Sequence, residues 1–405
     1  MTIAIIGGGI GGLALALSLH RHGIACDVYE AVPEVREIGV GITLLPHAMK
    51  ELAALGVQEK LEAVGIENLE SVFFNRYGQF IFREARGRHA GYDTPEIGLH
   101  RGKLHRVLYE AVLERLGAAH VHLDHRCLGI EQDEQGVTIR FQSAAGAIAS
   151  VSAESAIACD GVNSVVRRQF YPQEPLAFAG INTWRGVTVH APILSGKSYL
   201  RIGSIETGKM VIYPIADNVD GKGNQLVNWV AEIRREGAPM NDWNKAGTPR
   251  DFIDIFESWR FDWLDVPGLI RGAERIFEYP MVDKDPVPRW TFGRVTLLGD
   301  AAHPMYPRGS SGSAQAIIDA RTLAEQLVAS PDIPRALLGY EQLRLEKTAR
   351  IVETNRTVPP DFINIRVDEL SGGQPFRHID DLISQDELQR MSEEYKQVAG
   401  FALKK

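Results

Sequence analysis

The sequence contains little cysteine: Cys26, Cys127 and Cys159 are the only three among 405 residues. They are odd in number, widely spaced and without a C-x-x-C pair, so they indicate neither a disulfide framework nor a structural zinc site. No other metal-ligand cluster stands out, and we predict no bound metal. This cysteine usage fits a reducing cytoplasm.

Long apolar runs and an excess of positive charge are also missing. No run approaches the roughly 20 residues that span a bilayer, and no charged segment followed by an apolar core marks a leader. The chain has 44 Lys and Arg against 52 Asp and Glu, a net charge of −8, and no basic run with interleaved aromatics. We therefore expect a cytoplasmic globular protein with no membrane and no nucleic-acid partner.

The first sixteen residues, MTIAIIGGGIGGLALA, contain a glycine-rich turn. Residues 3–6 form an apolar run suited to a parallel strand, and residues 13–20 predict a helix, so the glycines lie in a strand-to-helix turn. Gly7, Gly9 and Gly12 match the pattern G-x-G-x-x-G, in which the turn and the helix N-terminus bind a pyrophosphate. We therefore predict a dinucleotide site at the start of the chain.

A second apolar strand ends in Glu30, 18 positions after Gly12. A carboxylate at this spacing accepts hydrogen bonds from a ribose. The alternative is a plain glycine-rich turn with a solvated Glu30. Taken alone, the pattern fits a nicotinamide dehydrogenase as readily as a flavoenzyme, but no second G-x-G-x-x-G is present for a second dinucleotide.

The rest of the chain alternates between two kinds of sequence pattern. Acidic residues end three apolar strands, at Glu30, Asp160 and Asp300, as expected for a parallel sheet. Residues 182–279 contain alternating, β-rich segments that predict an antiparallel sheet beside a substrate chamber, and residues 250–263 within them predict a helix. Helices are predicted near the C-terminus, so we expect an α/β fold in which an antiparallel sheet is interleaved with a Rossmann-like domain.

Three segments together resemble a known family: GGGIGG, CDGVNSVVR (residues 159–167) and GRVTLLGDAAHPMYPRGSSGSAQAIIDA (residues 293–320). They are similar to the signature segments of the single-component, FAD-dependent aromatic hydroxylases, the para-hydroxybenzoate and salicylate hydroxylase group. The resemblance spans roughly residues 1 to 350. Within the group, the segments TWRGVT, VNWV, YPMVDKDP and MYP most resemble the phenazine hydroxylases of pyocyanin formation.

The resemblance implies a fold and a set of cofactor contacts. The fold would be a Rossmann-like FAD-binding domain with an interleaved antiparallel-sheet substrate domain and C-terminal helices. The FAD-binding domain would comprise residues 1–70, 98–181 and 280–350, the substrate domain residues 71–97 and 182–279, and the helical tail residues 351–405. The implied FAD-binding residues are Gly9, Ile10, Gly11, Gly12, Glu30, Ala31, Gly41, Ile42, Arg101, Leu128, Asp160, Asp300, Ser311, Gly312 and Ser313.

Their implied roles run along the cofactor. Residues 9–12 and Glu30 would hold the ADP part, Arg101 the pyrophosphate region and Leu128 the adenine through its backbone. Asp300 would accept from ribityl or pyrophosphate-side groups, and residues 41–42 and 311–313 would flank the flavin ring. For Asp160, fixing its own loop is the alternative to a cofactor contact.

The chain departs from the family pattern at one place. Where the family often has Gly-x-Gln-Gly, this chain has Gly309-Ser310-Ser311-Gly312, so Ser311 replaces the glutamine. This puts the detailed contacts to the flavin ring in question, but not FAD itself.

The substrate chamber is predicted from aromatic and cationic residues in the β-rich region and after Pro304. Aromatic rings stack on a planar substrate, and an arginine pairs with a carboxylate. For the sheet aromatics the alternative is ordinary core, and for Arg185 it is an ion pair within the sheet. His303 is assigned to packing or to support of the flavin rather than to catalysis. The predicted residues are Trp184, Arg185, Tyr213, Trp229, Met305 and Tyr306, with lower weight on Arg308.

The implied reaction is hydroxylation of an aromatic carboxylic acid with a fused or nitrogen-containing ring, and loss of the carboxylate is left open. FAD would be reduced by NADH or NADPH and would react with O2 through a flavin hydroperoxide, so no catalytic side chain is singled out. The alternatives are ring hydroxylation of a benzoate or pyridine carboxylate, a flavin oxidase or dehydrogenase, and a non-catalytic FAD-binding scaffold. We expect a monomer or homodimer with a small aromatic partner.

Overall fold

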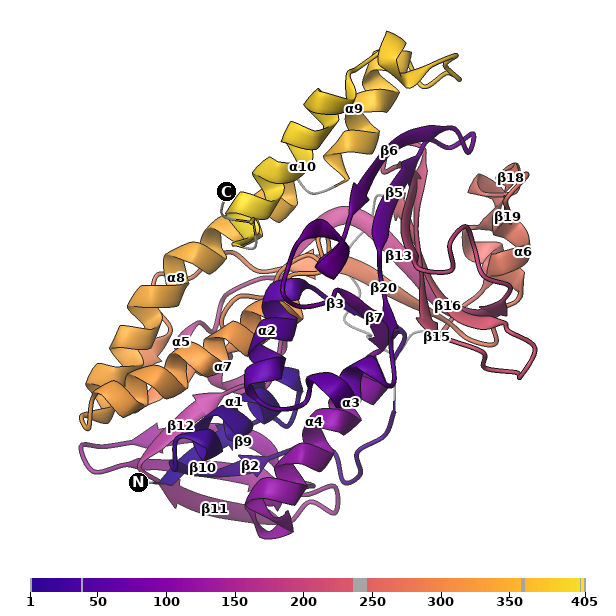
Figure 1. Ribbon diagram of the computed structural model, residues 1–405. Helices are drawn as coiled ribbons and strands as arrows, with labels where there is room; N and C mark the ends of the chain where they lie inside the picture. Colours follow the sequence, from indigo (N-terminus) through magenta and orange to yellow (C-terminus); the bar gives the residue numbers. More distant parts are fainter. Residues whose placement is uncertain (1, 38, 236–245, 358–360, 401, 404–405) are drawn as a thin grey trace.

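The computed structural model describes residues 2–37, 39–235, 246–357, 361–400 and 402–403. Residues 236–245, which fall inside the predicted substrate segment, lie outside the described residues. A six-stranded sheet forms the centre of the first half of the molecule (Figure 1), and its strands are parallel except for the edge strand β21. Its order is β21 (Thr291–Phe292), β22 (Val295–Leu297), β12 (Ser155–Ala158), β1 (Thr2–Ile6), β2 (Ala25–Tyr29) and β8 (Val121–His122).

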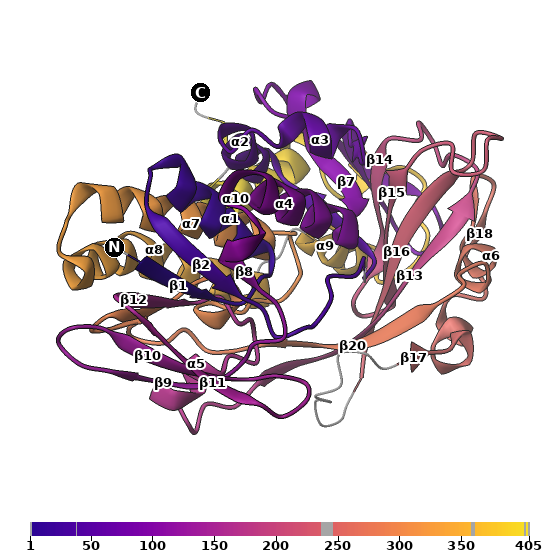
Figure 2. The ribbon, with the colours of Figure 1, turned by 90° about the horizontal axis from the view of Figure 1, so that it is seen from below.

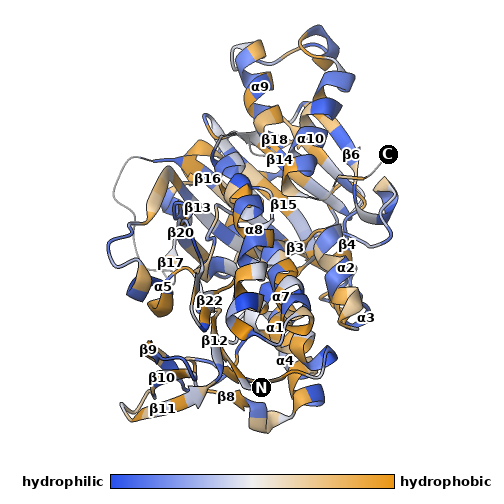
Figure 3. Cartoon of the chain, turned by 90° about the vertical axis from the view of Figure 1, so that its left-hand side faces the viewer, coloured by the Kyte–Doolittle hydropathy of each residue, from blue (hydrophilic) through white to orange (hydrophobic). Residues whose placement is uncertain are grey.

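Long helices pack against this sheet and against each other. α1 follows β1 directly, and it buries eight consecutive residues, from Gly12 to Leu19, because α4 and α7 lie against it. The hydropathy colouring in Figure 3 follows this packing, since α1 is coloured hydrophobic over most of its length. The helices of this half are α1 (Ile10–Arg21), α2 (Pro46–Ala54), α3 (Gln58–Glu62), α4 (Arg101–Leu116), α5 (Val165–Phe170), α7 (Gly312–Ala329) and α8 (Ile333–Thr357).

An eight-stranded sheet lies beside the parallel one (Figure 2), and all its neighbouring pairs are antiparallel except β14 with β5. It joins segments that are far apart in the sequence, because the early hairpin β5–β6 pairs at its edge. The order is β17 (Ala246–Gly247), β20 (Ile276–Asp283), β13 (Ala177–His190), β16 (Gln225–Arg234), β15 (Gly208–Ala216), β14 (Ser198–Ser204), β5 (Glu70–Phe74) and β6 (Phe80–Ala85).

Smaller elements complete the described fold. Two three-stranded sheets flank the main ones, and the helices α9 (Phe362–Ser371) and α10 (Gln385–Ala399) run along β5 and β6 (Figure 1). One small sheet has the order β11 (Ile148–Ala153), β10 (Val137–Gln142) and β9 (Arg126–Gln132), and the other β3 (Gly41–Leu44), β7 (Ile97–His100) and β4 (Ile66–Glu67). Outside the large sheet lie β18 (Arg260–Phe261), β19 (Leu264–Asp265) and α6 (Val266–Arg271).

The predicted α/β fold, with a parallel sheet, an interleaved antiparallel sheet and C-terminal helices, is confirmed. The predicted helix over residues 250–263 is wrong: this stretch forms the short 3₁₀ turns Pro249–Asp251 and Ile253–Ile255 before β18. Its apolar residues, such as Phe252 and Phe256, pack against the large sheet, but they do not belong to one continuous helix. The division into domains at particular residues stays a prediction.

Candidate cofactor and substrate site

The glycine turn between β1 and α1 leaves no room at two positions and open space at a third. A Cβ on Gly12 would lie 2.0 Å from the carbonyl oxygen of Gly7, and a Cβ on Gly7 would lie 2.4 Å from that of Cys159. A Cβ on Gly9 would meet nothing within 4 Å. No side chain caps α1, so its first N–H groups are presented by open backbone at Gly9, a suitable place for a phosphate.

Glu30 follows the carboxyl end of β2, beside this turn. Its carboxylate accepts from the backbone N–H groups of Gly8, at 2.7 Å, and Val32, at 2.9 Å. A carboxylate offers about four acceptor positions, and the protein uses two of them. The alternative of a merely solvated Glu30 is therefore wrong, because the side chain also holds the glycine turn through Gly8. Ala31 follows Glu30 directly in the chain.

Leu128 lies on β9, next to this end of β2. The ring of Tyr29 stacks on Phe141 of the neighbouring strand with 4.7 Å between centroids, and this contact holds the small sheet beside Glu30. Leu128 is the extra residue of a β-bulge, since Cys127 and Gly129 pair with consecutive residues of β10. A bulged residue is left out of the strand ladder, so its backbone suits the predicted contact to an adenine.

Arg101, Gly41 and Ile42 lie where the two halves of the molecule meet. Arg101 is the exposed first residue of α4, and its N–H donates to the carbonyl of Val40 at 2.9 Å. The N–H of Gly41 donates to Asn228 of the large sheet at 2.7 Å, and a Cβ on Gly41 would lie 2.6 Å from the Cβ of Asn228. The glycine therefore permits the close approach of β3 to β16.

Asp300 faces the start of α7. A Cβ on Gly312 would lie 3.9 Å from its Oδ1 and 3.8 Å from Cγ of Met305. Asp300 is exposed yet closely surrounded by protein, and this desolvation raises the pKa of Asp300, an effect that the charges of His303 and Arg101 oppose. Within the described part of the chain it makes no hydrogen bond or ion pair, so it is an acceptor still to be satisfied.

Residues 309–313 connect this carboxylate to the helix. Gly309 and Ser310 both have positive φ, 92° and 57°, and for Ser310 such a backbone costs of order 1 kcal/mol. Ser311 is buried, and its hydroxyl lies 3.2 Å from the hydroxyl of Tyr395 on α10, while Gly312 and Ser313 begin α7 without a side-chain cap. The open N–H groups at this N-terminus suit the flavin carbonyls.

His303 supports the site from beneath. Its Nε2 contacts Asp319, which also accepts from Gly299 N–H at 3.2 Å and from Arg344 at 2.6 Å. Although burial alone would raise it, the charges of His303 and Arg344 lower the pKa of Asp319 to about 2. These contacts fix the loop before Asp300, in agreement with the supporting role assigned to His303.

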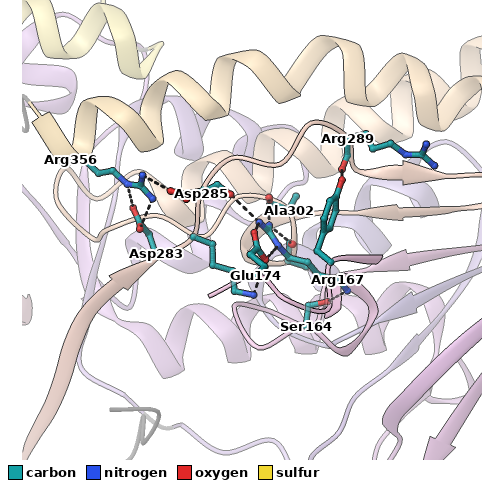
Figure 4. A network of polar contacts seen from close by, with 11 residues as sticks. Ser164, Arg167, Glu174, Asp283, Asp285, Arg289, Ala302 and Arg356 are labelled. Carbon is teal, nitrogen blue, oxygen red and sulfur yellow. Dashed lines mark hydrogen bonds and ion pairs between the residues drawn. The ribbon is translucent and has the colours of Figure 1, made fainter. Parts of the chain in front are cut away.

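Asp160 and Arg167 tie the second signature segment to the third. Asp160 accepts from the N–H of Val165 at 2.8 Å and so holds the start of α5, while its other oxygen is buried without a partner. Arg167 is 1% exposed and donates to the carbonyls of Ala301 at 3.0 Å and Ala302 at 2.6 Å (Figure 4). One oxygen of Asp160 therefore fixes its own loop, as the alternative predicted, and the other oxygen remains available for a cofactor contact.

The large sheet presents different side chains on its two faces. Trp184 and Trp229 are both fully buried in the core on the outer face, where Trp184 stacks on Phe252 at 4.9 Å. Their prediction as substrate contacts is corrected, because both side chains are packed inside this core, whereas Gly41 of β3 meets the opposite face through Asn228. Alternation along a strand places Trp184 and Arg185 on opposite faces, so the two cannot line the same chamber.

Arg185 and Tyr213 lie on the inner face of the large sheet, the face that β3 meets. The guanidinium of Arg185 lies 5.5 Å from the ring centroid of Tyr279, and Tyr213 stacks on Tyr199 at 5.0 Å. Among the described residues Arg185 forms no ion pair, and its Nε is buried without a hydrogen-bond partner. These side chains form an aromatic and cationic wall that suits a planar anion.

The loop after Pro304 divides the remaining predicted residues. Met305 is partly exposed next to Gly312 and belongs with the chamber, whereas Tyr306 packs against Ile181 and Met281 and lies 3.4 Å through its hydroxyl from the carbonyl of Ala177. Arg308 is buried and paired with Asp361 at 2.8 Å, so its charge is already compensated. Tyr306 and Arg308 thus stabilise the loop in this structure.

Sequence reasoning missed three residues. Asn228 and Arg201 each carried a signal, since each is a polar residue inside an apolar strand and points inward. Tyr395, whose hydroxyl lies near Ser311 and 3.1 Å from Asn355, carried none, because nothing local connects the C-terminal helix with a loop 84 residues earlier.

The open turn at Gly9, the unpartnered carboxylate oxygens of Asp300 and Asp160 and the two uncapped helix N-termini fit a long, phosphate-containing cofactor with hydroxyl and carbonyl groups. These features define a dinucleotide-binding protein of the Rossmann class. The chain belongs to the family described as FAD binding domain, whose model matches residues 1–355.

Relatives with assigned names agree with this membership. The chain is 39% identical over 361 residues to phenazine 1,6-dicarboxylic acid hydroxylase PhzS of Lysobacter antibioticus, covering 87% of this chain and 89% of the relative. It is 31% identical over 387 residues to 3-hydroxybenzoate 6-hydroxylase of Polaromonas naphthalenivorans strain CJ2, covering 88% and 86%. The resemblance predicted from the three segments and FAD as cofactor are confirmed.

A solved structure shares the fold. Klebsiella pneumoniae HpxO complexed with FAD and uric acid aligns with a TM-score of 0.76 at 24% identity, covering 99% of this chain and 96% of that one. Within the described residues, no helix is long and apolar enough to cross a membrane, and no group of three His, Cys, Asp or Glu side chains is arranged to hold a metal.

Replacing Asp300 by asparagine should weaken FAD binding about 10- to 150-fold, the range of one hydrogen bond to a charged group. The fold should be retained, because the described structure gives this carboxylate no protein partner. FAD titration of the purified variant measures the dissociation constant, and Asp254→Asn, on the exposed outer layer, is the control. An unchanged dissociation constant for FAD would contradict the role given to Asp300.

Proposed function

We propose that the protein is an FAD-dependent monooxygenase that uses NADH or NADPH and O2 to hydroxylate an aromatic carboxylic acid with a fused or nitrogen-containing ring. The observation that carries the proposal is the wall formed by Arg185, Tyr213 and Tyr279 on the inner face of the large sheet, the face that β3 meets. The relatives are named as hydroxylases of phenazine dicarboxylic acid and hydroxybenzoate, which supports an aromatic acid as the substrate.

Bound FAD supplies the redox chemistry that side chains do not provide. Overall, NAD(P)H, a proton, O2 and an aromatic C–H become NAD(P)⁺, water and an aromatic C–OH. The chain's own residues bind the ring in place, hold its charge and exclude water. The residues proposed to hold the cofactor are those around Gly9, Glu30, Arg101, Asp300 and the start of α7.

The polar groups of the wall have distinct tasks. Arg185 has a buried Nε without a partner, and its guanidinium is placed to bind the substrate carboxylate. Burial raises the pKa of Tyr213 far above neutral pH, with the charge of Tyr199 adding to the effect. Its hydroxyl therefore keeps its proton and can donate a hydrogen bond to an oxygen or ring nitrogen of the substrate.

Helix α10 closes this region from the side of the C-terminal tail. Tyr395 is buried at 6% exposure between Ser311 and Asn355, and Lys396 pairs with Glu84 of β6 at 2.9 Å. The tail, to which no chemistry was assigned from the sequence, therefore covers the loop that begins α7. This cover excludes water from the loop at the start of α7.

The test is the consumption of NADH and NADPH by the purified yellow protein with and without aromatic acids. We expect a phenazine, benzoate or pyridine carboxylate to accelerate consumption, with one hydroxylated product formed per NAD(P)H by mass spectrometry. The same product analysis shows whether the carboxylate is kept, and comparison of the two nucleotides gives the preference. Formation of hydrogen peroxide alone with every acid would instead support an oxidase, and size-exclusion chromatography distinguishes a monomer from a homodimer.

A further inference from the structure

Two arginines lie in the same row across the inner face of the large sheet. Arg185 of β13 pairs in register with Val230, Val230 with Val211, and Val211 with Arg201 of β14. Residues directly opposite each other in paired strands point to the same face, so an arginine stands at each end of a floor of two valines. Three strand spacings of about 4.8 Å separate the two backbones by about 14 Å.

Arg201 is buried and has no counter-charge. It is 6% exposed, bonds to the hydroxyl of Ser71, and its guanidinium lies 4.5 Å from the ring centroid of Tyr199 and 5.0 Å from that of Phe73. In the part of the chain that the structure describes, neither Arg201 nor Arg185 forms an ion pair. A buried cation without an anion is costly, so a ligand that supplies the anion gains affinity there.

The other cations near Arg201 are already neutralised. Arg201 lines a small cavity together with Arg86, Lys396, Tyr395 and Gly309. Arg86 pairs with two carboxylates at 2.8 and 2.9 Å, and Lys396 pairs with one of the same two at 2.9 Å. Among the described residues Arg201 is thus the cation of this cavity that forms no ion pair, while Glu84, which Arg86 and Lys396 bind, also lines the cavity. Gly309 connects the cavity to the loop at the start of α7.

The row from Arg185 to Arg201 is bounded on both sides by contacts with other parts of the chain. On one side, Asn228 receives the N–H of Gly41, which belongs to the strand predicted to flank the flavin. On the other side, Lys209 contacts Glu232 at 2.8 Å and Asp361 at 3.1 Å, and Arg308 completes this closed ionic group. The floor between Arg185 and Arg201 therefore lies between the contact with β3 and this ionic group.

We propose that the substrate is a planar aromatic dianion, with one acidic group at Arg185 and a second at Arg201. The proposal rests on the monooxygenase function given above and adds the second anion site. The valines Val211 and Val230 form an apolar floor for the rings, and Tyr213 and Tyr199 border it. An elongated fused-ring dicarboxylate engages both guanidinium groups, whereas an acid with one carboxylate engages only one.

The experiment measures dissociation constants of the FAD-loaded enzyme for phenazine, phenazine-1-carboxylate and phenazine-1,6-dicarboxylate, by the change in flavin absorbance. Wild type should bind the diacid most tightly. Arg201→Met should weaken the diacid about 10- to 150-fold, the range of one charged hydrogen bond, while the affinity for uncharged phenazine stays within about 2-fold. Arg201→Lys, which keeps the charge, should restore part of the diacid affinity.

A measurement on the wild type guards against a variant that does not fold. The monomethyl ester of the diacid should bind as weakly as the monoacid. An ester that binds as tightly as the diacid, or an Arg201→Met variant that weakens phenazine as much as the diacid, would overturn the second anion site. If both tests fail while another aromatic acid still drives hydroxylation, the dianion proposal is wrong and the monooxygenase stands. If no aromatic acid stimulates NAD(P)H consumption, the proposed function itself fails.

Discussion

Gly12→Ala should cost the protein its FAD and more than about 3 kcal/mol of folding stability. The added methyl would lie 2.0 Å from the carbonyl oxygen of Gly7, and that oxygen belongs to a turn pressed in turn against Cys159. Neither partner is a flexible side chain, so relief requires α1 to move away from β1. Because α1 is buried between the sheet, α4 and α7, such a shift disturbs the core of the whole FAD-binding half.

Gly9→Ala is the matched control for this substitution. Gly9 has φ −75° and ψ −174°, a conformation that alanine adopts freely, and its Cβ would meet nothing within 4 Å. Its folding stability should therefore be unchanged or slightly higher, while the methyl at the phosphate-facing turn lowers FAD affinity. Denaturant unfolding with excess FAD, together with FAD content after purification, separates the two effects. Equal stability of the two variants would contradict the packing role of Gly12.

Arg167→Met should destabilise the protein by about 3 kcal/mol, the lower end of the range for removing one partner of a buried ion pair. Arg167 binds Glu174 through two nitrogens and also donates to the carbonyls of Ala301 and Ala302 (Figure 4). The loss stays at the lower end because Lys284 still contacts Glu174 at 3.1 Å. Since those carbonyls directly follow Asp300, FAD affinity should fall as well.

Arg168→Met is the control, because Arg168 is exposed on the same helix. Its effect on unfolding should stay within about 0.5 kcal/mol, as for ordinary surface substitutions. The free energy of unfolding of both holoproteins in urea gives the comparison. A loss below about 1 kcal/mol for Arg167→Met would show that the link between the second and third signature segments is not important for stability.

The C-terminal helices show where sequence reasoning reached its limit. A helical tail was predicted over residues 351–405, and the structure places one of its helices at Gln385–Ala399. Its contact through Tyr395 with Ser311 was not predicted, because a hydrogen bond across 84 residues leaves no local pattern. The serine that replaces the usual glutamine thus has a partner that only the folded chain reveals.

The large sheet shows a second limit. Its antiparallel character followed from alternating residues, but Trp184 and Trp229 were assigned to the chamber by their aromatic chemistry alone. Side-chain alternation already separates Trp184 from Arg185, whereas deciding which of the two faces the cofactor requires the packing of Gly41 against Asn228. Chemistry selects candidate residues, and sheet packing decides among them.

The sequence by itself determined the features that depend on local backbone geometry: the glycine turn after β1 and the acidic strand ends at Glu30, Asp160 and Asp300. The resemblance of three of its segments to a known family added the class of cofactor. Only the tertiary structure decided the features that depend on register between distant strands. The row from Arg185 to Arg201 exists because four strands align through a chain of pairings, and no short stretch of sequence encodes that alignment. The glycine turn anchors the cofactor, but the sheet register decides what the cofactor faces.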